Sequence, residues 1–488
     1  MTSSAVLFAA AISARVGRGH LNRCIAISDT LQRRGIVTAL YDSANDFLDM
    51  DARIGIDLLR GEEDVRRFMM AHTDRLVFLD DYSFRAGAPS IPGADSDTRF
   101  AMLDDFDEMP ERVDRLFRLT RSGGAENLAG NPAVIAGEHL APLRPTFFAA
   151  RRHRKADGSL LICLGTSELG KSATRQILTM LTDLTCGRSL IVAAPYAETK
   201  ARQLEKDFDR LNMQVLSTVT DLSPLMARAS KAICTPSVTS YELATLGVPL
   251  FAVQIADNQA RLGQHIQRNN AAQLVVPETD APEDMAQKLG AFLGADPSSV
   301  VTSRLRVDGL GARRIARHLH HELSGKQAPP VRLEIATDED LEPLFRLQCM
   351  PEIRAHARNP EAPSLEEHAT WFRAMMADPA REFFLMMVDQ SMAGFIRIDR
   401  LQDGFGAGPD HYEISIAVDP AFWGQGLASD ALDYLFDLLP DDVFIAHVLP
   451  ENDRSHGLFR RAGFAWRDNR YERLPSVAVE KSGLEAGS

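Results

Sequence analysis

The chain has 488 residues, a formal net charge of -13, and 45% hydrophobic and 25% charged residues. This length exceeds one ordinary core and predicts about three folded units, and the composition argues against both a disordered and a fibrous protein. The negative charge, with no block rich in Lys or Arg, excludes nucleic acid as an expected partner.

Cysteine usage and hydropathy indicate the compartment. The five cysteines are scattered and never spaced C-x-x-C, so we expect reduced thiols rather than a disulfide framework. No apolar run reaches the roughly 18 residues of a membrane span, and no basic segment precedes the apolar residues 5–12, as it would in a signal peptide. The expectation is a cytoplasmic protein without a membrane partner.

The first 320 residues alternate short apolar runs with helical patterns, as doubly wound α/β domains do. The expected strands are 6–9, 75–79, 160–164, 189–193, 231–234 and 249–253. Several end where polar or Gly-rich residues begin, which is where open parallel sheets collect ligands. A break near Arg144-Pro145 and a basic stretch at 151–157 divide this region. We predict a GT-B-like pair of Rossmann-type domains, residues 1–150 and 151–323.

A linker at 324–330 (SGKQAPP) separates this region from a different pattern. After it we expect a strand at 331–335, a helix start at Thr337 and Asp340, and a capping box at Ser364 and Glu367. Strands are then expected at 383–388, 393–398 and 411–418. The prediction is a C-terminal α+β domain over 331–478 and a disordered tail at 479–488.

A glycine-rich turn follows the first expected strand. Gly17, Gly19, His20 and Arg23 lie in the segment GRGHLNR, which leads into an expected helix at 24–33. The glycines let the backbone approach a ligand, and His20 is expected to project from the turn. A histidine accepts protons from water near neutral pH, so His20 is a candidate base, with a solvated or core histidine as the plainer interpretation.

A second polar turn lies in the segment TPSVTSYE at 235–242. Hydroxyls and free amides at a helix N-terminus suit a pyrophosphate, which makes Ser237, Thr239 and Ser240 candidate ligands. Glu242, one turn into the helix, is placed to accept hydrogen bonds from ribose hydroxyls, or is an ordinary helix glutamate. Asn258 and Gln259 follow in the segment ADNQ.

Residues 5–320 resemble the UDP-sugar hydrolases of pseudaminic acid biosynthesis, relatives of the MurG-type glycosyltransferases. The motifs are GRGHLNR, LDDY at 79–82, LDD at 103–105, a G…LRP element at 137–145, SYELATLGVP…ADNQ, and VDGLGARRI at 307–315. The resemblance implies that water cleaves the sugar–UDP bond with His20 as base and no metal. It also implies UDP-sugar contacts from Gly17, Gly19, Arg23, Ser237, Thr239, Ser240, Glu242, Asn258 and Gln259.

The chain departs from that family at three places. Ser237-Val238-Thr239 replaces a G-S-T turn, residues 165–169 (GTSEL) replace a G-G-S-D-P loop, and Leu140 replaces a tyrosine. These differences leave the substrate less defined than the fold.

A glycine turn of a second kind follows the strand 411–418. Residues 423–428 read WGQGLA and lead into an expected helix at 429–438, and residues 451–464 contain an E-N-x-x-S…G-F element. Both resemble the GNAT acetyltransferases over about 331–470. The resemblance implies acetyl-CoA as cosubstrate, bound by Ile416, Val418, Trp423, Gly424, Gln425, Gly426, Leu427, Ala428, Asn452 and Ser455.

Acetyl transfer needs a proton acceptor for the attacking amine. Glu413 is the candidate base, with a structural or orienting role as the alternative. Phe459 stands where many family members place a tyrosine that protonates the departing thiolate, so that role falls to another group or to water.

Residues 363–368 and Trp371 resemble, more loosely, the GNAT subgroup that acetylates UDP-linked 4-amino sugars. The first hypothesis is therefore a bifunctional enzyme of nonulosonate synthesis, with a UDP-linked amino sugar and other pathway enzymes as partners. The second is a glycosyltransferase fused to a protein or peptide acetyltransferase, and the third is a fusion whose first half only binds a nucleotide sugar. A legionaminic-type isomer remains open.

The cluster His318, His320 and His321 lies at an expected helix end before the linker. Imidazoles suit the negative end of a helix dipole. We expect this role and no metal site.

Overall fold

The computed structural model describes residues 4–10, 19–42, 55–81, 90–104, 109–120, 128, 131–165, 167–184, 187–194, 196–217, 219, 221–269, 271–295, 305–326, 329–357, 359–401 and 409–475. The chain forms two compact units, residues 1–326 and 327–488. The boundary falls inside the linker predicted at 324–330. The tail expected at 479–488 lies outside the described residues.

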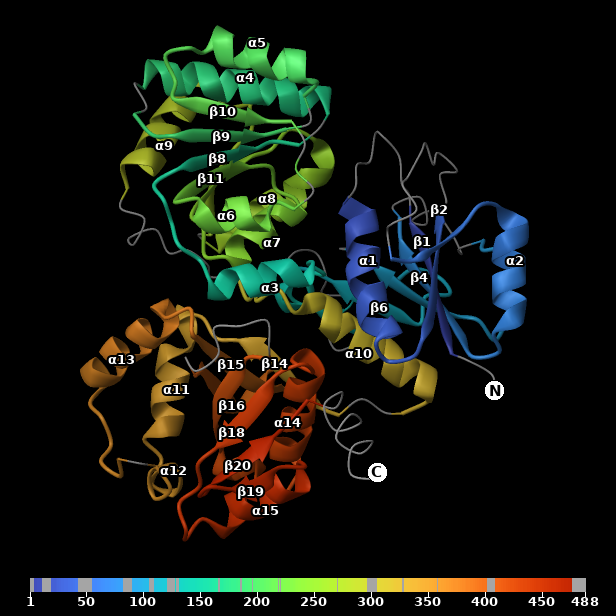
Figure 1. Ribbon diagram of the computed structural model, residues 1–488, viewed down its shortest axis with the longest axis vertical. Helices are drawn as coiled ribbons and strands as arrows, with labels where there is room; N and C mark the ends of the chain where they lie inside the picture. The colour runs from blue at the N-terminus through green and yellow to red at the C-terminus, as the bar shows by residue number, and fades with distance from the viewer. Residues whose placement is uncertain are drawn as a thin grey trace, which may run out of the picture. The chain divides into compact units, whose positions relative to one another are not determined.

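The first half of unit 1 is a parallel sheet with strand order β3-β2-β1-β4-β5-β6-β7 (Figure 1). Its strands are β1 (Ala5–Ala10), β2 (Val37–Asp42), β3 (Asp57–Leu59), β4 (Arg75–Asp80), β5 (Arg99–Leu103), β6 (Arg115–Arg118) and β7 (Val134–Ala136). Its helical segments are α1 (Gly19–Gln32), α2 (Glu62–Ala71) and η3 (Glu138–Leu140). Every residue of β1 is buried, as its continuous apolar run predicts for a parallel strand covered on both faces.

The second half repeats this plan with the order β10-β9-β8-β11-β12-β13. Its strands are β8 (Leu160–Cys163), β9 (Leu190–Ala193), β10 (Met213–Leu216), β11 (Lys231–Cys234), β12 (Leu250–Val253) and β13 (Ala272–Val275). The helical segments are α3 (Pro145–Arg152), α4 (Glu168–Asp183), α5 (Glu198–Asp207), α6 (Ser223–Arg228), α7 (Val238–Thr245), η4 (Asp257–Gln259), α8 (Ala260–Arg268), α9 (Pro282–Gly294) and α10 (Gly311–Ser324). Both halves have the strand order of a Rossmann-type sheet.

Helix α10 follows the second half in the chain but packs against α1 and η3 of the first half (Figure 1). At its start Arg314 and Asp308 form an ion pair that is completely buried. The Arg314 guanidinium also donates to the carbonyl oxygen of His139 at 2.9 Å. Gly311 lies so close to the carbonyl of Ala141 that a side chain there would collide with backbone. These contacts explain why the segment VDGLGARRI has this composition.

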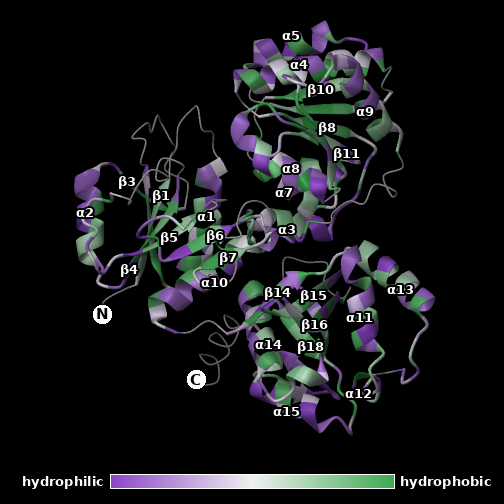
Figure 2. Cartoon of the chain, turned by 180° about the vertical axis from the view of Figure 1, so that it is seen from behind, coloured by the Kyte–Doolittle hydropathy of each residue, from purple (hydrophilic) through white to green (hydrophobic). Residues whose placement is uncertain are grey.

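Unit 2 is a sheet with the order β14-β15-β16-β17-β18-β20-β19. Its strands are β14 (Val331–Ile335), β15 (Arg381–Val388), β16 (Ser391–Arg400), β17 (His411–Val418), β18 (Val443–Ala446), β19 (Ala465–Arg467) and β20 (Arg470–Arg473). Its helical segments are η5 (Asp338–Asp340), α11 (Leu341–Gln348), α12 (Pro351–Arg354), α13 (Leu365–Ala377), η6 (Pro420–Phe422), α14 (Leu427–Leu438) and α15 (Asp453–Arg461). In Figure 2 the strands of this sheet are largely hydrophobic, while its helices also carry hydrophilic residues.

One pair in this sheet is parallel and short. Strand β17 pairs antiparallel with β16 along most of its length, over residues 412–418. It pairs with β18 in parallel only at residues 411–413. The described part of β17 beyond Glu413 therefore has no ladder partner on its β18 side.

The predicted fold class, a GT-B-like pair of Rossmann-type domains followed by a GNAT-type α+β domain, is confirmed at the level of these sheets. Capping boxes form at Thr337 with Asp340 and at Ser364 with Glu367, as expected. The boundary predicted at 150 falls inside α3, which contacts α6 and α7. Helix α1 begins at Gly19 rather than at 24, so the expectation that His20 lies in the turn is wrong. Within the described residues, none of the helices combines the length and apolar character needed to cross a bilayer.

The buried ion pair generates a stability prediction. Arg314→Met leaves the Asp308 carboxylate buried without its counter-charge, and this should cost roughly 3–5 kcal/mol. Thermal and urea unfolding of the full chain measure the loss. Arg202→Met is the matched control, because it removes an exposed i,i+4 partner of Glu198 worth under about 1 kcal/mol. Equal effects of the two substitutions would contradict the prediction.

Candidate functional sites

In unit 1, His20 and Arg23 lie one turn apart on α1 and both contact Asp80, the last residue of β4. His20 Nδ1 lies 2.8 Å from Asp80 Oδ1. Arg23 donates to Asp80 from Nε at 2.9 Å and from Nη2 at 2.6 Å. All three residues are largely or completely buried. The i,i+3 spacing puts His20 and Arg23 on one helix face.

The charge of Asp80 fixes the proton on His20. Burial by itself raises the pKa of Asp80, but the nearby charges of Arg23 and His20 and their hydrogen bonds outweigh it and hold that pKa below its ordinary value. An ionised carboxylate only accepts hydrogen bonds, and a guanidinium only donates. Arg23 Nη2 also lies 2.8 Å from His20 Nδ1. We place a proton on Nδ1 of His20, which donates it to the Asp80 carboxylate. Arg23 Nη2 is then a neighbour of Nδ1 and does not donate a hydrogen bond to it.

The position of these residues follows from the strand order. Strands β1 and β4 are neighbours, and the order reverses between them, from β2 and β3 on one side to β5 on the other. Ligands of open α/β sheets bind at the carboxyl ends of strands at this reversal. His20 follows β1, and Asp80 ends β4. Gly17 and Tyr82 lie outside the described residues, and Gly19 is the first residue of α1.

The second half has its reversal between β8 and β11, and α7 begins directly after β11. Ser237 is its N-cap, and its hydroxyl accepts from the Thr239 amide at 3.3 Å. Ser240 is completely buried, and its hydroxyl donates to the Thr235 carbonyl at 3.0 Å. This placement favours a capping role for Ser240 over a phosphate contact, while Ser237 and Thr239 remain partly accessible.

Glu242 lies on α7, near the ion pair of Arg144 with Asp221, whose atoms are 3.3 Å apart. Burial is the main cause that raises the pKa of Glu242 from 4.5 to about 7; Arg144 opposes the rise and Asp221 adds to it. The buried thiols of Cys163 and Cys234 are nearby, and burial raises the pKa of Cys234 to about 12. Burial therefore keeps a proton on Glu242 to a higher pH than an ordinary carboxyl group would hold it.

Asn258 and Gln259 lie on η4. Asn258 is exposed. Gln259 is partly buried, and its Oε1 accepts from the Ile255 amide at 2.9 Å. The Gln259 side chain therefore holds its own turn, and Asn258 is the one of the two whose amide faces solvent.

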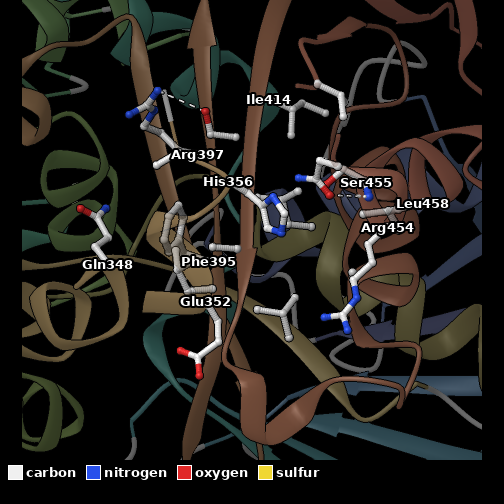
Figure 3. A pocket seen from close by; sticks show the side chains of 18 of the residues that line it. Gln348, Glu352, His356, Phe395, Arg397, Ile414, Arg454, Ser455 and Leu458 are labelled. Carbon is white, nitrogen blue, oxygen red and sulfur yellow. Dashed lines mark hydrogen bonds between the residues drawn. The ribbon is translucent and has the colours of Figure 1, made fainter. Parts of the chain in front are cut away.

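Unit 2 contains a cavity of about 1570 Å³. Figure 3 shows its walls: Gln348 and Glu352 from the α11–α12 region, Phe395 and Arg397 from β16, Ile414 from β17, and Arg454 and Ser455 from α15. Of the residues predicted to bind acetyl-CoA, all but Gln425 line this cavity. The structure thus brings the two predicted motifs of this unit together.

The unpaired edge of β17 forms part of this cavity. Residues 414–418 all line it, and at about 3.4 Å per residue they span about 17 Å. Such an edge presents backbone N–H and C=O groups to any extended chain that carries amides. Beyond its end, Gly424 and Gly426 have φ values of 80° and 81°, which glycine adopts without strain. Gly426 is the N-cap of α14, so free amides face this end of the cavity.

Side chains brace this glycine turn. The indole nitrogen of Trp423 donates to the Val418 carbonyl at 2.8 Å, and the Arg454 guanidinium lies 4.3 Å from the centre of the Trp423 ring. Asn452 caps α15 by accepting from the Ser455 amide at 3.1 Å. A cation and two helix N-termini at one end of the cavity suit an anionic group such as a pyrophosphate.

At the opposite end of the unpaired edge, Glu413 Oε1 lies 3.2 Å from Nδ1 of His447. His447 follows β18 directly and is nearly half exposed. Sequence reasoning did not select His447, because no motif surrounds it. Asp80 was also not assigned a role, although the motif LDDY contains it. Phe459 is buried against Tyr471, with ring centroids 5.8 Å apart.

The histidine cluster has a different role from the one expected. His318 is partly buried, its ring centroid 5.9 Å from that of Phe117, and desolvation, reinforced by Arg115, lowers the pKa of His318 to about 3. Burial and Arg317 lower the pKa of His321 to about 4. These lowered pKa values disfavour the charged imidazoles that the expected charge–dipole interaction needs. Among the described residues no group of His, Cys, Asp and Glu is arranged to hold a metal ion.

Residues 331–465 match the acetyltransferase (GNAT) domain family. Among solved structures, the chain is similar to MurG of Acinetobacter baumannii, at 15% identity and a TM-score of 0.47, over 65% of this chain and 99% of that one. It is also similar to the ribosomal L7/L12 alpha-N-protein acetyltransferase RimL in complex with coenzyme A, at 18% identity and a TM-score of 0.27, over 30% of this chain and 97% of that one. A third is spermidine N-acetyltransferase of Vibrio cholerae with CoA and spermine, at 20% identity and a TM-score of 0.27, over 30% and 96%.

Glu242 generates a prediction on the pH dependence of stability. Between pH 4.5 and about 7 the folded chain keeps a proton that the unfolded chain has released, so this group lowers stability as the pH rises through that window, and the cost is fully present above it. Glu242→Gln should therefore raise the melting temperature at pH 8 and leave it unchanged at pH 4.5.

Thermal unfolding at the two pH values measures this difference. Glu278→Gln is the matched control, because Glu278 is exposed and its replacement should have no pH-dependent effect. An equal shift of the Glu242→Gln melting temperature at both pH values would contradict the prediction.

Proposed function

We propose that the chain is a bifunctional nucleotide-sugar enzyme of pseudaminic acid synthesis. Unit 2 acetylates the 4-amino group of UDP-4-amino-4,6-dideoxy-N-acetyl-β-L-altrosamine with acetyl-CoA. Unit 1 hydrolyses the product, UDP-2,4-diacetamido-2,4,6-trideoxy-β-L-altropyranose, to UDP and the free sugar. The observation that carries the proposal is that each unit has a phosphate-compatible helix N-terminus and a proton-accepting side chain at the places the two chemistries need.

The acetyl-transfer half rests on the family match over residues 331–465 and on the cavity of unit 2. The pyrophosphate of coenzyme A would lie at Gly424 and Gly426, where free amides meet. The pantetheine arm, which carries two amides, would then continue along the unpaired edge of β17 as an additional strand. In this direction the thioester would lie near Glu413, the residue directly before the unpaired edge.

At the thioester, the neutral amine attacks the carbonyl carbon, the C–S bond breaks, and coenzyme A leaves as a thiolate. The amine must first lose a proton, because an ammonium group has no lone pair for attack. Glu413 is the candidate acceptor for that proton, in accord with its position beside the end of the pantetheine path.

The hydrolytic half rests on His20 and Asp80. With Nδ1–H held by the Asp80 carboxylate, Nε2 is the nitrogen that takes a proton from water as the water oxygen attacks the anomeric carbon. The bond from this carbon to the diphosphate oxygen breaks, and UDP leaves with its electrons. The N-terminal end of α7, where Ser237 and Thr239 are partly accessible, would stabilise the charge on the diphosphate through the helix dipole, and the Glu242 carboxylate would accept from ribose hydroxyls.

His20→Ala should separate the two activities. With the amino sugar and acetyl-CoA, the variant should release CoA at the wild-type rate, and UDP release should fall at least about 100-fold because the general base is missing. Mass spectrometry should show the acetylated UDP-sugar accumulating. Wild-type UDP release by this variant would refute the role of His20, and transfer of the sugar to an acceptor other than water would favour a glycosyltransferase.

Gly426→Ala should impair acetyl transfer and leave hydrolysis unchanged. Alanine at φ 81° costs about 1 kcal/mol, and its methyl group lies where the diphosphate would approach, so KM for acetyl-CoA should rise about tenfold. Hydrolysis of the already acetylated UDP-sugar should be unchanged. Gly325→Ala is the matched control, since Gly325 also has a positive φ, of 62°, at the end of α10. Loss of both activities in Gly426→Ala alone would contradict separate sites.

A further inference from the structure

Glu413 and His447 meet where β17 and β18 separate. Glu413 is directly opposite Ile445 in the short parallel ladder, and His447 comes two residues after Ile445. The Glu413 side chain is 19% exposed and the His447 side chain 46%. The carboxylate thus faces the cavity from a sheltered position, while the imidazole that contacts it reaches solvent.

Neighbouring charges on the same sheet face are paired with other groups. Asp399 lies opposite Glu413 on β16, and Arg397 binds Asp399 at 2.9 Å. Glu472 lies opposite Ile445 on β20 and is 3.9 Å from Arg467. Across the cavity, the charged and titratable side chains of the helical wall are Glu352, Arg354, His356, Glu361, Glu367 and His368. His447 is the imidazole in contact with Glu413.

We propose that Glu413 and His447 act together as a proton relay for acetyl transfer, with His447 as the group that passes the proton to solvent. This inference rests on the proposed acetyl transfer in unit 2. In the first step, the ammonium form of the acceptor gives a proton to the Glu413 carboxylate and becomes the nucleophilic amine. In the second, the Glu413 carboxyl gives that proton to Nδ1 of neutral His447 in its Nε2–H tautomer, in which Nδ1 carries a lone pair. The imidazolium then gives a proton to water, so the net transfer is from ammonium to water.

The relay combines the position of one side chain with the proton chemistry of the other. A carboxylate is ordinarily protonated only in acid, whereas an imidazole changes charge between pH 5 and 8. Glu413 lies at the end of the pantetheine path, where the acceptor nitrogen must be, and His447 supplies an imidazole, the kind of side chain that ordinarily exchanges protons near neutral pH. Their 3.2 Å contact joins the two properties. His447 acts through Glu413 and is therefore a positioning and proton-accepting partner.

The kinetic test uses the full-length protein, acetyl-CoA and the UDP-linked 4-amino sugar. His447→Gln keeps an amide group that can form a hydrogen bond with Glu413 as donor or acceptor but cannot take up a proton. At pH 8 this variant and His447→Ala should both lose about 100-fold in kcat, with KM for acetyl-CoA unchanged. Added imidazole should restore His447→Ala at least tenfold, because the site is open to solvent. The pH dependence of activity between pH 6 and pH 8 should be weaker in both variants than in the wild type, because only the protonation of the acceptor amine then contributes to it. His411→Gln, on the same strand but outside the cavity, should behave as wild type.

A second measurement needs no acceptor. In ¹⁵N-histidine spectra of the full chain, the Nδ1 resonance assigned by its loss in His447→Gln should move on Glu413→Gln. A resonance that stays in place would overturn the pairing, and a His447→Gln enzyme as fast as wild type would overturn the relay, since a hydrogen bond alone would then suffice. If wild-type protein does not acetylate the amino sugar, the proposed substrate is wrong, and the relay is tested with the same variants on spermine as the amine; no difference among them there would overturn it.

Discussion

Each candidate site of this chain lies where the strand order of a parallel sheet reverses or where two neighbouring parallel strands separate. Between β1 and β4, and between β8 and β11, the connections leave in opposite directions because the strand order reverses. Between β17 and β18 the strands themselves separate after three paired residues. At such places polar side chains and free amides can face a ligand from the carboxyl ends of the strands without disrupting a core. His20 with Asp80, the cap of α7, and Glu413 with His447 all depend on this constraint.

Much of this architecture could be predicted from local sequence. Buried strands read as continuous apolar runs, and the capping boxes at Ser364 and at Thr337 are set by side chains three residues apart. Local sequence patterns could not predict the contacts between distant segments. His20 and Asp80 are 60 residues apart, and Glu413 and His447 are 34 apart. Each contact exists only because strand register aligns the two ends.

Motif spacing can also mislead when the fold is not considered. Residues 165–172 (GTSELGKS) have the spacing of a phosphate-binding loop that ends in Lys and Ser. Here α4 already begins at Glu168, and its cap Ser167 accepts from the Gly170 amide. Lys171 binds Glu168 one turn away. The start of α4 therefore uses the residues that such a loop would need. Ser240 is a similar case, because its hydroxyl, expected to contact a ligand, donates instead to the Thr235 carbonyl of its own turn.

The return of α10 to the first half has a mechanical consequence. Its last turns are tied to that half through Arg115, which donates to Glu322 at 2.9 Å, and through Arg34 beside His320, in addition to the buried pair at its start. The described contacts thus anchor α10 on the half that carries His20. A force applied at the end of α10 would therefore act first on the first half of unit 1, because Arg115 and Arg34 of that half hold this end of the helix.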